Sequence, residues 1–596
     1  MAEVMTPHSV WSATLKPQVM GRRGVVAAGN PLVAEAGLRI LEKGGTAIDA
    51  GVATVFAAAV VEQMSVGLGG EVPILIKPAG KPVVAINGLG YAPEKATAAF
   101  YETLAKDDPR RGPFPAMIGG GSGIIPSFGP LSAIVPGMVG GLLLALCDYG
   151  TMSFSEVIRP AIELAHGFPA DARLARKLKL DEPTYSKWPA SLRVYKPNGK
   201  SVEEGGVWAQ PDLARTLETL SEVEKKEKGK GREKAIHAVR DYFYRGALAK
   251  KIAEFCRGAG CLISEKDLAD FQARVEQPIR TNYRGVEVYK VGFWSQSPVF
   301  IENANLLEAF DLKAMGHNSP QYVHTVVEAM KLGYADRDAY YGDPDFSKIP
   351  LQLLSKDYAK LRRALIHEKQ ASGEHIVGDP ERMQARAPAE FARDRLRHRN
   401  GEHQDTTCVN VIDQTGNVFS ATPSGAWSPA VIAGDTGIPL TQRAQAFVLT
   451  PGHPNQIAPR KRPRITLTPS IALKNGEPWL AFSTPGGDSQ DQTLLQIFLN
   501  VVEFGMQPQE ALEKPRFNSL AMYSSFDNHG DQPLALEVES RFPQETLAQL
   551  RALGHKLVVQ SEWGNTTSPT LIEFDPRSGV IKAGADVRGH RYAVAW

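Results

Sequence analysis

The chain has 596 residues, of which 43% are hydrophobic and 22% are charged, as in an ordinary folded, water-soluble protein. A formal net charge of +2 argues against nucleic acid or an anionic membrane as the main partner. The four cysteines have neither metal-ligand nor disulfide-framework spacing, so we expect no metal, no cofactor and no disulfide scaffold.

The N-terminal residues 1–23 lack the apolar core of a secretory signal. The most apolar run, 50–61, is shorter than the roughly 20 residues that a membrane-spanning helix needs. We therefore expect a soluble, cytoplasmic protein without a membrane partner, and keep a periplasmic or secreted location as the alternative.

The first 370 residues are predicted to be mainly helical. Helix 46–63 is apolar on all sides, so a large body must enclose it. The glycines at 67–70 lead into a strand and lack a following Lys-Ser/Thr, which indicates a tight turn and not a phosphate loop. The charged run 222–234 indicates a solvated helix end or an exposed insertion. Strands are expected at 24–28, 72–76, 83–86 and 286–289, and helices at 31–41, 46–63, 138–146, within 153–185, and at 206–223, 246–257, 265–271 and 319–341.

The chain changes character near residue 406. Residues 372–405 are polar and rich in Arg, Pro and Glu, as in a long exposed connection. Closely spaced strands are then expected at 408–413, 418–422, 447–449, 467–473 and 478–483, followed by a helix at 491–503. Sheets packed between layers of helices would account for both the mainly helical first part and the strand-rich second part.

A threonine stands where the polar connection meets the first of these strands. The hydroxyl of Thr406 is a weak nucleophile unless a base lies beside it. Its own α-amino group, with an unperturbed pKa of about 7.7–8.0, would act as this base once the peptide bond after Asp405 is cut. We therefore predict that the chain cleaves itself between Asp405 and Thr406. The alternative is a surface loop that simply enters a hairpin.

A second candidate lies at Pro485-Gly486-Gly487, between a predicted strand and a predicted helix. Consecutive glycines there can direct backbone N–H groups at a developing oxyanion, although such a pair is more often only a turn. The chain has no Gly-x-Ser-x-Gly, His-Glu-x-x-His or Cys-x-x-Cys motif, so serine-hydrolase elbows, zinc proteases and redox pairs are unsupported.

From about Gly24 to the C-terminus, the chain contains short sequence motifs in the same order as in the γ-glutamyltransferase (γ-glutamyl transpeptidase) family of N-terminal-nucleophile hydrolases. In these motifs the chain resembles that family. Those before residue 405 are 30–32, 44–50, 67–70, 129–131, 135–137, 210–213, 334–337 and 342–346. Those after it are 405–407, 434–438, 461–463 and 485–487.

The resemblance implies an α/β (α+β) fold, a four-layer αββα sandwich made as one precursor. Cleavage before Thr406 would give a large subunit, 1–405, and a small subunit, 406–596, which form a heterodimer with further dimerisation as an option. Thr406 would be the nucleophile, Ser424 would assist its amine, and Gly486 and Gly487 would form the oxyanion hole. Cys408 replaces a usual histidine.

The expected substrate pocket departs from the family. Leu89 replaces the arginine that clamps the substrate α-carboxylate, and Ala446, beside Gln445, replaces the acid that holds the α-amino group. Ile465 and Thr466 replace two serines, and Ala426 replaces an asparagine. Charge-assisted bonds of about 1.5–3 kcal/mol each are lost, which would weaken binding of a free glutamyl group by orders of magnitude. A short connection between residues 447 and 461 predicts that the family's lid is absent and the site open.

We therefore expect a self-processing threonine amidohydrolase or acyltransferase that cleaves a small-molecule or peptide-like amide whose acyl group is not a free γ-glutamyl group. One alternative is a genuine γ-glutamyltransferase or glutathione hydrolase that binds its substrate with other residues, the nearest cations being Arg443 and Arg464. Another is a non-catalytic scaffold, which retention of Thr406, Ser424 and the glycine pair disfavours.

Overall fold

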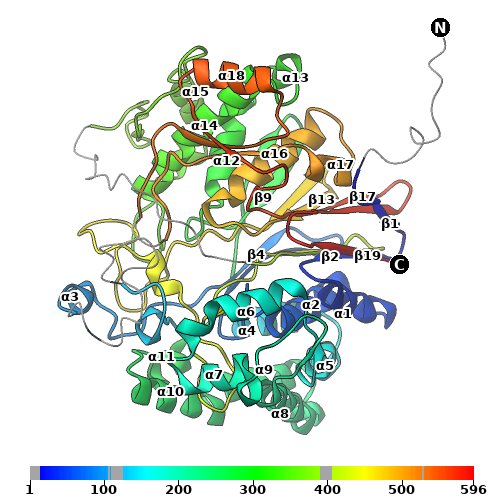
Figure 1. The fold of residues 1–596 in the computed structure, drawn as a ribbon. Coiled ribbons are helices and arrows are strands. Elements are labelled where there is room, and N and C mark those ends of the chain that lie inside the picture. The colour runs from blue at the N-terminus through cyan, green and yellow to red at the C-terminus, as the bar shows by residue number, and fades with distance from the viewer. Residues whose placement is uncertain (1–13, 105–107, 109–124, 389–405, 527–528) are drawn as a thin grey trace.

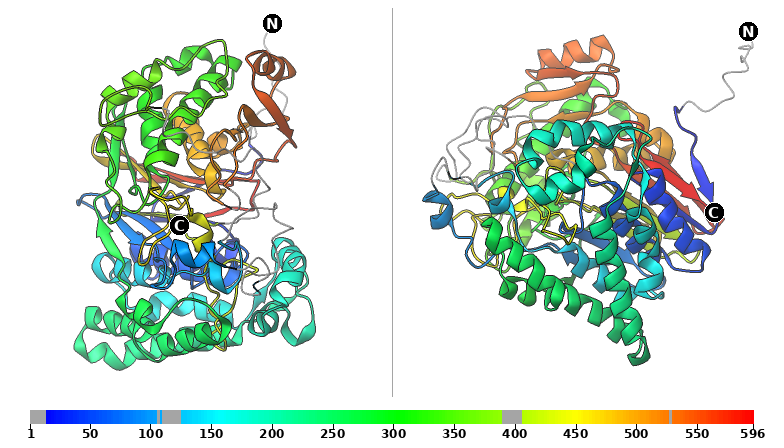
Figure 2. Two further views of the ribbon diagram at one scale, coloured as in Figure 1. Left: turned by 90° about the vertical axis from the view of Figure 1, so that its left-hand side faces the viewer. Right: turned by 60° about the horizontal axis from the view of Figure 1, so that its bottom comes forward.

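The computed structural model describes residues 14–104, 108, 125–388, 406–526 and 529–596. Two seven-stranded antiparallel sheets lie face to face in its centre, and helices cover the outer side of each (Figures 1 and 2). The expected four-layer αββα sandwich is confirmed.

The first sheet has the order β1 (Val19–Gly21), β18 (Val580–Ala585), β17 (Thr570–Asp575), β13 (Glu477–Ser483), β12 (Ser470–Lys474), β9 (Val286–Lys290) and β8 (Ile279–Tyr283). The second has the order β19 (Tyr592–Ala595), β2 (Gly24–Ala28), β10 (Val409–Asp413), β11 (Val418–Ala421), β3 (Val72–Lys77), β4 (Val84–Gly88) and β7 (Arg274–Glu276). Both sheets combine strands from before and after residue 406. The two predicted subunits therefore share their hydrogen-bond ladders and are not separate domains.

One helical layer covers the second sheet, at the bottom of Figure 1. It contains α1 (Pro31–Glu42), α2 (Ala47–Val61), α4 (Met138–Tyr149), α5 (Phe154–Ala165), α6 (Ala172–Tyr185), α7 (Pro189–Tyr195), α8 (Pro211–Glu227), α9 (Arg232–Tyr244), α10 (Ala247–Ala259) and α11 (Glu265–Asp270). As its composition predicts, every residue of α2 is buried. The short helix α3 (Ala98–Glu102) lies at one end, and β5 (Phe168–Pro169) pairs with β6 (Val207–Trp208).

The other helical layer covers the first sheet. It contains α12 (Pro298–Leu307), α13 (Leu312–Met315), α14 (Pro320–Tyr340), α15 (Lys356–Arg363), α16 (Gln490–Val502), α17 (Pro508–Glu513) and α18 (Gln544–Ala552). A small sheet of β14 (Phe517–Ser519), β15 (Ala535–Glu539) and β16 (Lys556–Gln560) accompanies it.

Two predicted strands need correction. Residues 447–449 form no strand but a single bridge between Val448 and Gln456, because a 3-10 turn at Arg443–Ala446 precedes them and the Asn455 side chain binds the Ala446 carbonyl at 2.6 Å. The strand expected from 467 begins only at Ser470. The predicted loop over 108–130 falls largely on residues outside the described ranges, and Pro130–Ser132 form a 3-10 turn.

Part of the predicted polar connection is packed against the protein. Residues 372–388 contain no helix or strand, yet Ile376 and residues 378–380 are buried. The Arg362 side chain donates to the Ile376 carbonyl at 2.5 Å, and the Gly378 N–H donates to Asp336 at 2.8 Å. The prediction that the whole connection 372–405 is exposed is therefore wrong for these buried residues. Residues 389–405 lie outside the described ranges.

The charged run at 222–234 joins α8 to α9 through a 3-10 turn, and most of it is exposed, as predicted. Glu224 is the exception. Its buried carboxylate accepts the N–H groups of Phe154 at 2.9 Å and Ser155 at 3.0 Å, at the start of α5. One acidic residue of the run therefore caps a neighbouring helix. None of the helices in the described ranges has the length and apolar character needed to cross a bilayer.

Asp49 provides a test of the buried layer. Its carboxylate closes the capping box of α2 with Thr46 and accepts the N–H groups of Thr151 at 2.8 Å and Met152 at 3.0 Å. Asp49→Ala removes the buried acceptor of these N–H groups and opens the capping box, so we expect a loss of about 2 kcal/mol in unfolding free energy. Urea denaturation followed by tryptophan fluorescence measures it. Glu42→Ala, at the exposed end of α1, should stay within about 0.5 kcal/mol; equal midpoints for the two variants would contradict the interpretation.

Candidate active site

The register of three neighbouring strands places Thr406. In the β10–β11 hairpin Val409 lies opposite Ala421, and the same pairing continues beyond the strand ends to Thr406 opposite Ser424. The β11–β3 pairing likewise continues to Ser424 opposite Glu71. Directly opposed residues project from the same face of a sheet. Thr406, Ser424 and Glu71 therefore form one row.

Hydrogen bonds connect the side chains of this row through Arg443, which lies in the turn Arg443–Ala446. The Thr406 and Ser424 hydroxyl oxygens are 2.9 Å apart. Arg443 donates from Nη2 to the Ser424 hydroxyl oxygen at 3.1 Å and from Nε to Glu71 at 2.6 Å. All four side chains are buried. Because a guanidinium only donates, the Ser424 hydrogen can be directed at Thr406.

A second arginine–glutamate pair flanks Thr406. Arg591 donates to the Thr406 carbonyl at 3.4 Å and to the Thr407 hydroxyl at 2.8 Å. Its Nη1 lies 3.6 Å from the carboxylate of Glu62, at the end of α2. No local sequence pattern points to Glu71, Glu62 or Arg591, because only the strand register and the folded chain bring them to Thr406.

Burial determines the protonation of neighbouring groups. It raises the pKa of the Glu71 carboxyl, an effect that Arg443 opposes through its charge and hydrogen bond. Burial also raises the pKa of the Cys408 thiol, which lies 3.6 Å from the Thr570 hydroxyl. This thiol therefore remains protonated at neutral pH and is not an activated thiolate.

The glycine pair forms a tight turn after β13 that requires glycine. Gly486 has φ 121° and Gly487 has φ 54°, values that favour glycine. A Cβ at Gly486 would also lie only 2.5 Å from the Thr567 side chain. Gln296 donates to the Gly487 carbonyl at 3.2 Å and thereby helps to fix this turn.

Two contacts link the glycine turn to the Thr406 strand. Asn410, four residues after Thr406, donates to the hydroxyl of Ser483, three residues before Gly486, at 2.9 Å. Thr567 packs against Gly486, and its neighbour Ser568 accepts a hydrogen bond from Arg591 at 2.9 Å. Thr406, just before β10, and the glycine pair, just after β13, therefore lie at the same end of the two facing sheets.

The six predicted pocket positions are all buried and uncharged; they are Leu89, Ala426, Gln445, Ala446, Ile465 and Thr466. Leu89 and Ile465 belong to one hydrophobic cluster, together with Phe447. Gln445 donates to the Ser127 carbonyl at 3.2 Å. Their character agrees with a pocket that lacks the family's charged clamp.

The two alternative cations are already paired. Arg443 binds Glu71, and Arg464 donates to Asp338 at 3.2 Å and to Ser525 at 3.1 Å. Burial lowers the pKa of Arg464 to about 10. Neither arginine is free to replace the missing carboxylate clamp without breaking a buried ion pair.

The expected absence of the lid between residues 447 and 461 stays a prediction, but the site is not open in the uncut chain. The Thr406 residue is only 4% exposed, and Ser424 is fully buried. Next to the Thr406 row, the Phe526 ring centroid lies 5.9 Å from the Arg443 guanidinium, and a His529 ring nitrogen lies 3.1 Å from the Phe447 carbonyl oxygen. Asp405, the other half of the predicted cleavage site, lies outside the described residues.

The described residues contain one group of possible metal ligands, formed by His324 and Glu328 of α14 and by His555. The two histidine rings approach within 2.9 Å, and Glu328 accepts the Lys331 ammonium at 2.6 Å and the Ser372 N–H at 3.1 Å. These atoms already bind one another, and the ammonium opposes a second cation. The group is a buried cross-link between α14 and the segment after α18.

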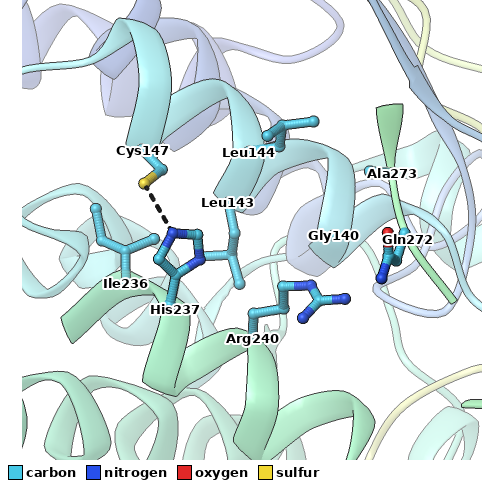
Figure 3. Close-up of a pocket in the computed structure, with 9 residues that line it drawn as sticks. All are labelled: Gly140, Leu143, Leu144, Cys147, Ile236, His237, Arg240, Gln272 and Ala273. Atoms are coloured by element: carbon cyan, nitrogen blue, oxygen red, sulfur yellow. Dashed lines mark hydrogen bonds between the residues drawn. The ribbon is translucent and has the colours of Figure 1, made fainter. Parts of the chain in front are cut away.

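A pocket of about 230 Å³ lies away from the Thr406 row, between α4 and α9 (Figure 3). His237 points toward Cys147 across it, with 3.9 Å between Nε2 and Sγ. Burial raises the pKa of the Cys147 thiol to about 11, so this pair is not an activated thiolate. The pocket contains none of the predicted site residues.

Comparison with known proteins gives consistent similarities along the chain. A family model for gamma-glutamyltranspeptidase matches residues 33–596. The glutathione hydrolase proenzyme of Bacillus subtilis (strain 168) is 31% identical over 576 residues, which cover 95% of this chain and 90% of the relative. The acylase ACY 1 proenzyme of Pseudomonas sp. (strain SE83) is 32% identical over 94% of this chain and 91% of the relative. The crystal structure of a cephalosporin acylase from Bacillus halodurans matches with a TM-score of 0.82 and 28% identity, covering 99% of both chains.

Ala426 provides a test of strain beside Ser424. Its φ of 54° is left-handed, a conformation that asparagine tolerates better than alanine. An alanine in this conformation is strained by about 1–2 kcal/mol. This strain exceeds the roughly 0.4–1 kcal/mol of extra chain entropy that a glycine at the same position would lose on folding. Ala426→Gly should therefore raise the unfolding free energy by about 0.5 kcal/mol, as measured by urea denaturation. Ala421→Gly, in the extended strand β11, should lower it by about 1 kcal/mol; equal losses in both variants would show that Ala426 is unstrained.

Proposed function

The chain belongs to the gamma-glutamyltranspeptidase family, and from this premise we propose that Thr406 is the nucleophile for an amide whose acyl group is not a free γ-glutamyl group. The chain is a self-processing hydrolase or acyltransferase of the N-terminal-nucleophile class, as the resemblance predicted. The observation that carries the proposal is the 2.9 Å approach of the Thr406 hydroxyl to Ser424. The buried, uncharged side chains at the six predicted pocket positions support the choice of acyl group.

Processing follows from the row of side chains. The Thr406 oxygen adds to the carbonyl carbon of Asp405, and its proton passes to the amide nitrogen as the carbon–nitrogen bond breaks. Water then hydrolyses the resulting ester, leaving Asp405 with a carboxylate and Thr406 with a free amine. Ser424 supplies a hydrogen bond to the attacking oxygen throughout. The cut segments stay together as a heterodimer, because each central sheet contains strands from both.

Turnover repeats this chemistry on a substrate amide. The α-amine of Thr406 takes the hydroxyl proton while the oxygen attacks the acyl carbon, and the N–H groups of Gly486 and Gly487 stabilise the oxyanion. The amine returns the proton to the leaving nitrogen, which gives an acyl ester on Thr406. Water, activated by the same amine, releases the acid; an amine acceptor would instead give a new amide.

The residues at the predicted pocket positions favour an apolar or neutral acyl group. Leu89, Ala426, Ala446 and Ile465 offer no side-chain partner for an α-carboxylate or α-ammonium group. A buried unpaired charge costs several kcal/mol, so a glutamyl zwitterion would be rejected. The similarity to acylase proenzymes supports the same choice. The similarity to glutathione hydrolase proenzymes makes γ-glutamyl amides the second candidate.

The Thr406 side chain tests self-processing. We expect the purified wild-type protein to run as two bands on a denaturing gel and Thr406→Ala to remain one, because alanine has no oxygen to attack the preceding carbonyl. Thr406→Ser should still be cut, but more slowly. Gel densitometry during incubation measures the rates. A Thr406→Ala protein cut at the same bond would exclude Thr406 as the nucleophile.

A panel of chromogenic anilides tests the acyl group. We expect the processed enzyme to hydrolyse simple acyl anilides at least 100-fold faster, in kcat/KM, than γ-glutamyl-p-nitroanilide, because about 2.7 kcal/mol of binding is a factor of 100. Glycylglycine, added as an acceptor, serves as the control for transfer. Rapid γ-glutamyl turnover accelerated by glycylglycine would overturn the acylase assignment and leave Thr406 in place.

A further inference from the structure

We propose that the buried Arg443–Glu71 pair is a positioning device that directs the Ser424 hydroxyl at Thr406. This inference rests on the proposed role of Thr406 as the nucleophile. Arg443 and Glu71 do not contact the reacting atoms in this account, but act through Ser424.

The guanidinium of Arg443 makes two contacts in different directions. Its Nη2 donates to the Ser424 hydroxyl oxygen at 3.1 Å and its Nε to Glu71 at 2.6 Å. A planar fork fixes both directions at once, which an ammonium on a flexible stem cannot do. Because the guanidinium can only donate, the Ser424 oxygen accepts from Arg443, and the Ser424 O–H can donate to the Thr406 oxygen 2.9 Å away.

Each part of the pair is held by other groups. Glu71 also accepts from the Thr441 hydroxyl at 3.1 Å, and the Arg443 guanidinium lies 5.1 Å from the Trp427 ring centroid. The backbones of Glu71 and Ser424 exchange N–H···O bonds of 2.9 and 3.0 Å. The arginine therefore has little freedom relative to the hydroxyl that it contacts.

The same geometry gives the pair an electrostatic effect on the Thr406 amine. Four charged groups on different elements surround this position; they are Arg443, Glu71, Arg591 and Glu62. The protonated Cys408 thiol lies two residues along the strand. The cationic end of the Arg443–Glu71 pair is the one that reaches Ser424. Removing Arg443 should therefore raise the amine pKa, and removing the charge of Glu71 should lower it.

Paired substitutions separate this role from a loss of stability. The variants are Arg443→Gln, Arg443→Lys, Glu71→Gln and the double Glu71→Gln/Arg443→Gln. The matched control is Arg362→Gln, which removes an equally buried arginine from its 3.2 Å pair with Asp336 on α14. Processing rates of purified precursors, and kcat and KM of processed enzyme on the best anilide, are measured from pH 5 to pH 10.

We expect Arg443→Gln to lower kcat on the order of 10²-fold with little change in KM, since a directed hydrogen bond to the reacting oxygen is lost. The acid limb of kcat/KM should move to higher pH in Arg443→Gln and to lower pH in Glu71→Gln. Arg443→Lys should restore the position of that limb but not the rate. The double variant should be slow, with its limb near that of the wild type.

An unchanged pH profile and kcat in Arg443→Gln, or equal losses in Arg362→Gln, would overturn the proposal. If Arg443→Gln does not accumulate as folded protein, Glu71→Gln and Arg443→Lys carry the test, and an unshifted acid limb in both would overturn it. Failure of the proposed function gives a different result on the processing gel, because the wild type would then remain uncut or Thr406→Ala would still be cut.

Discussion

The candidate site depends on one antiparallel register. The pairing of β10 with β11 and of β11 with β3 does not stop where the strands end, so Thr406, Ser424 and Glu71 lie side by side. A slip of one residue in either ladder would turn the corresponding side chain to the opposite face. The central sheets therefore hold Thr406, the proposed nucleophile, to Ser424 more tightly than a loop could, which suits chemistry that needs its groups placed within a fraction of an ångström.

Buried charge is the second constraint on this region. Thr406 lies between Arg443–Glu71 and Arg591–Glu62, and all four charged side chains are buried. Breaking such a pair costs about 3–5 kcal/mol, so each side chain keeps its partner in a fixed position. Since both arginines donate to the Thr406–Ser424 region, the charges that stabilise one another also organise the hydroxyl groups.

Periodicity and turn signals predicted most of the elements, because α2, α14, β10 and β13 have strong local patterns. They failed at 447–449, where Asn455 binds the backbone that a strand would have used. The nucleophile and the glycine pair could be proposed from the sequence, since a threonine after a polar stretch and a Gly-Gly turn are local features. Glu71 and Arg591 could not, because Glu71 reads as the end of a glycine turn and Arg591 is 185 residues from Thr406 in the chain.

The structure also changes the view of substrate recognition. The sequence suggested an open pocket, whereas Thr406 and Ser424 are buried in the uncut chain and Phe526 lies beside Arg443. With Arg443 and Arg464 engaged in ion pairs, we propose that selectivity rests on shape and apolar contact rather than on a charged clamp.

The most direct test of the account is intact-mass analysis of the protein quenched in acid during turnover of a slow acyl anilide. We predict a small subunit that begins at Thr406 and carries one acyl group, which peptide mapping places on the Thr406 hydroxyl. An acyl group on another residue, or a single uncut chain that still turns over the substrate, would contradict the assignment of Thr406 as the nucleophile.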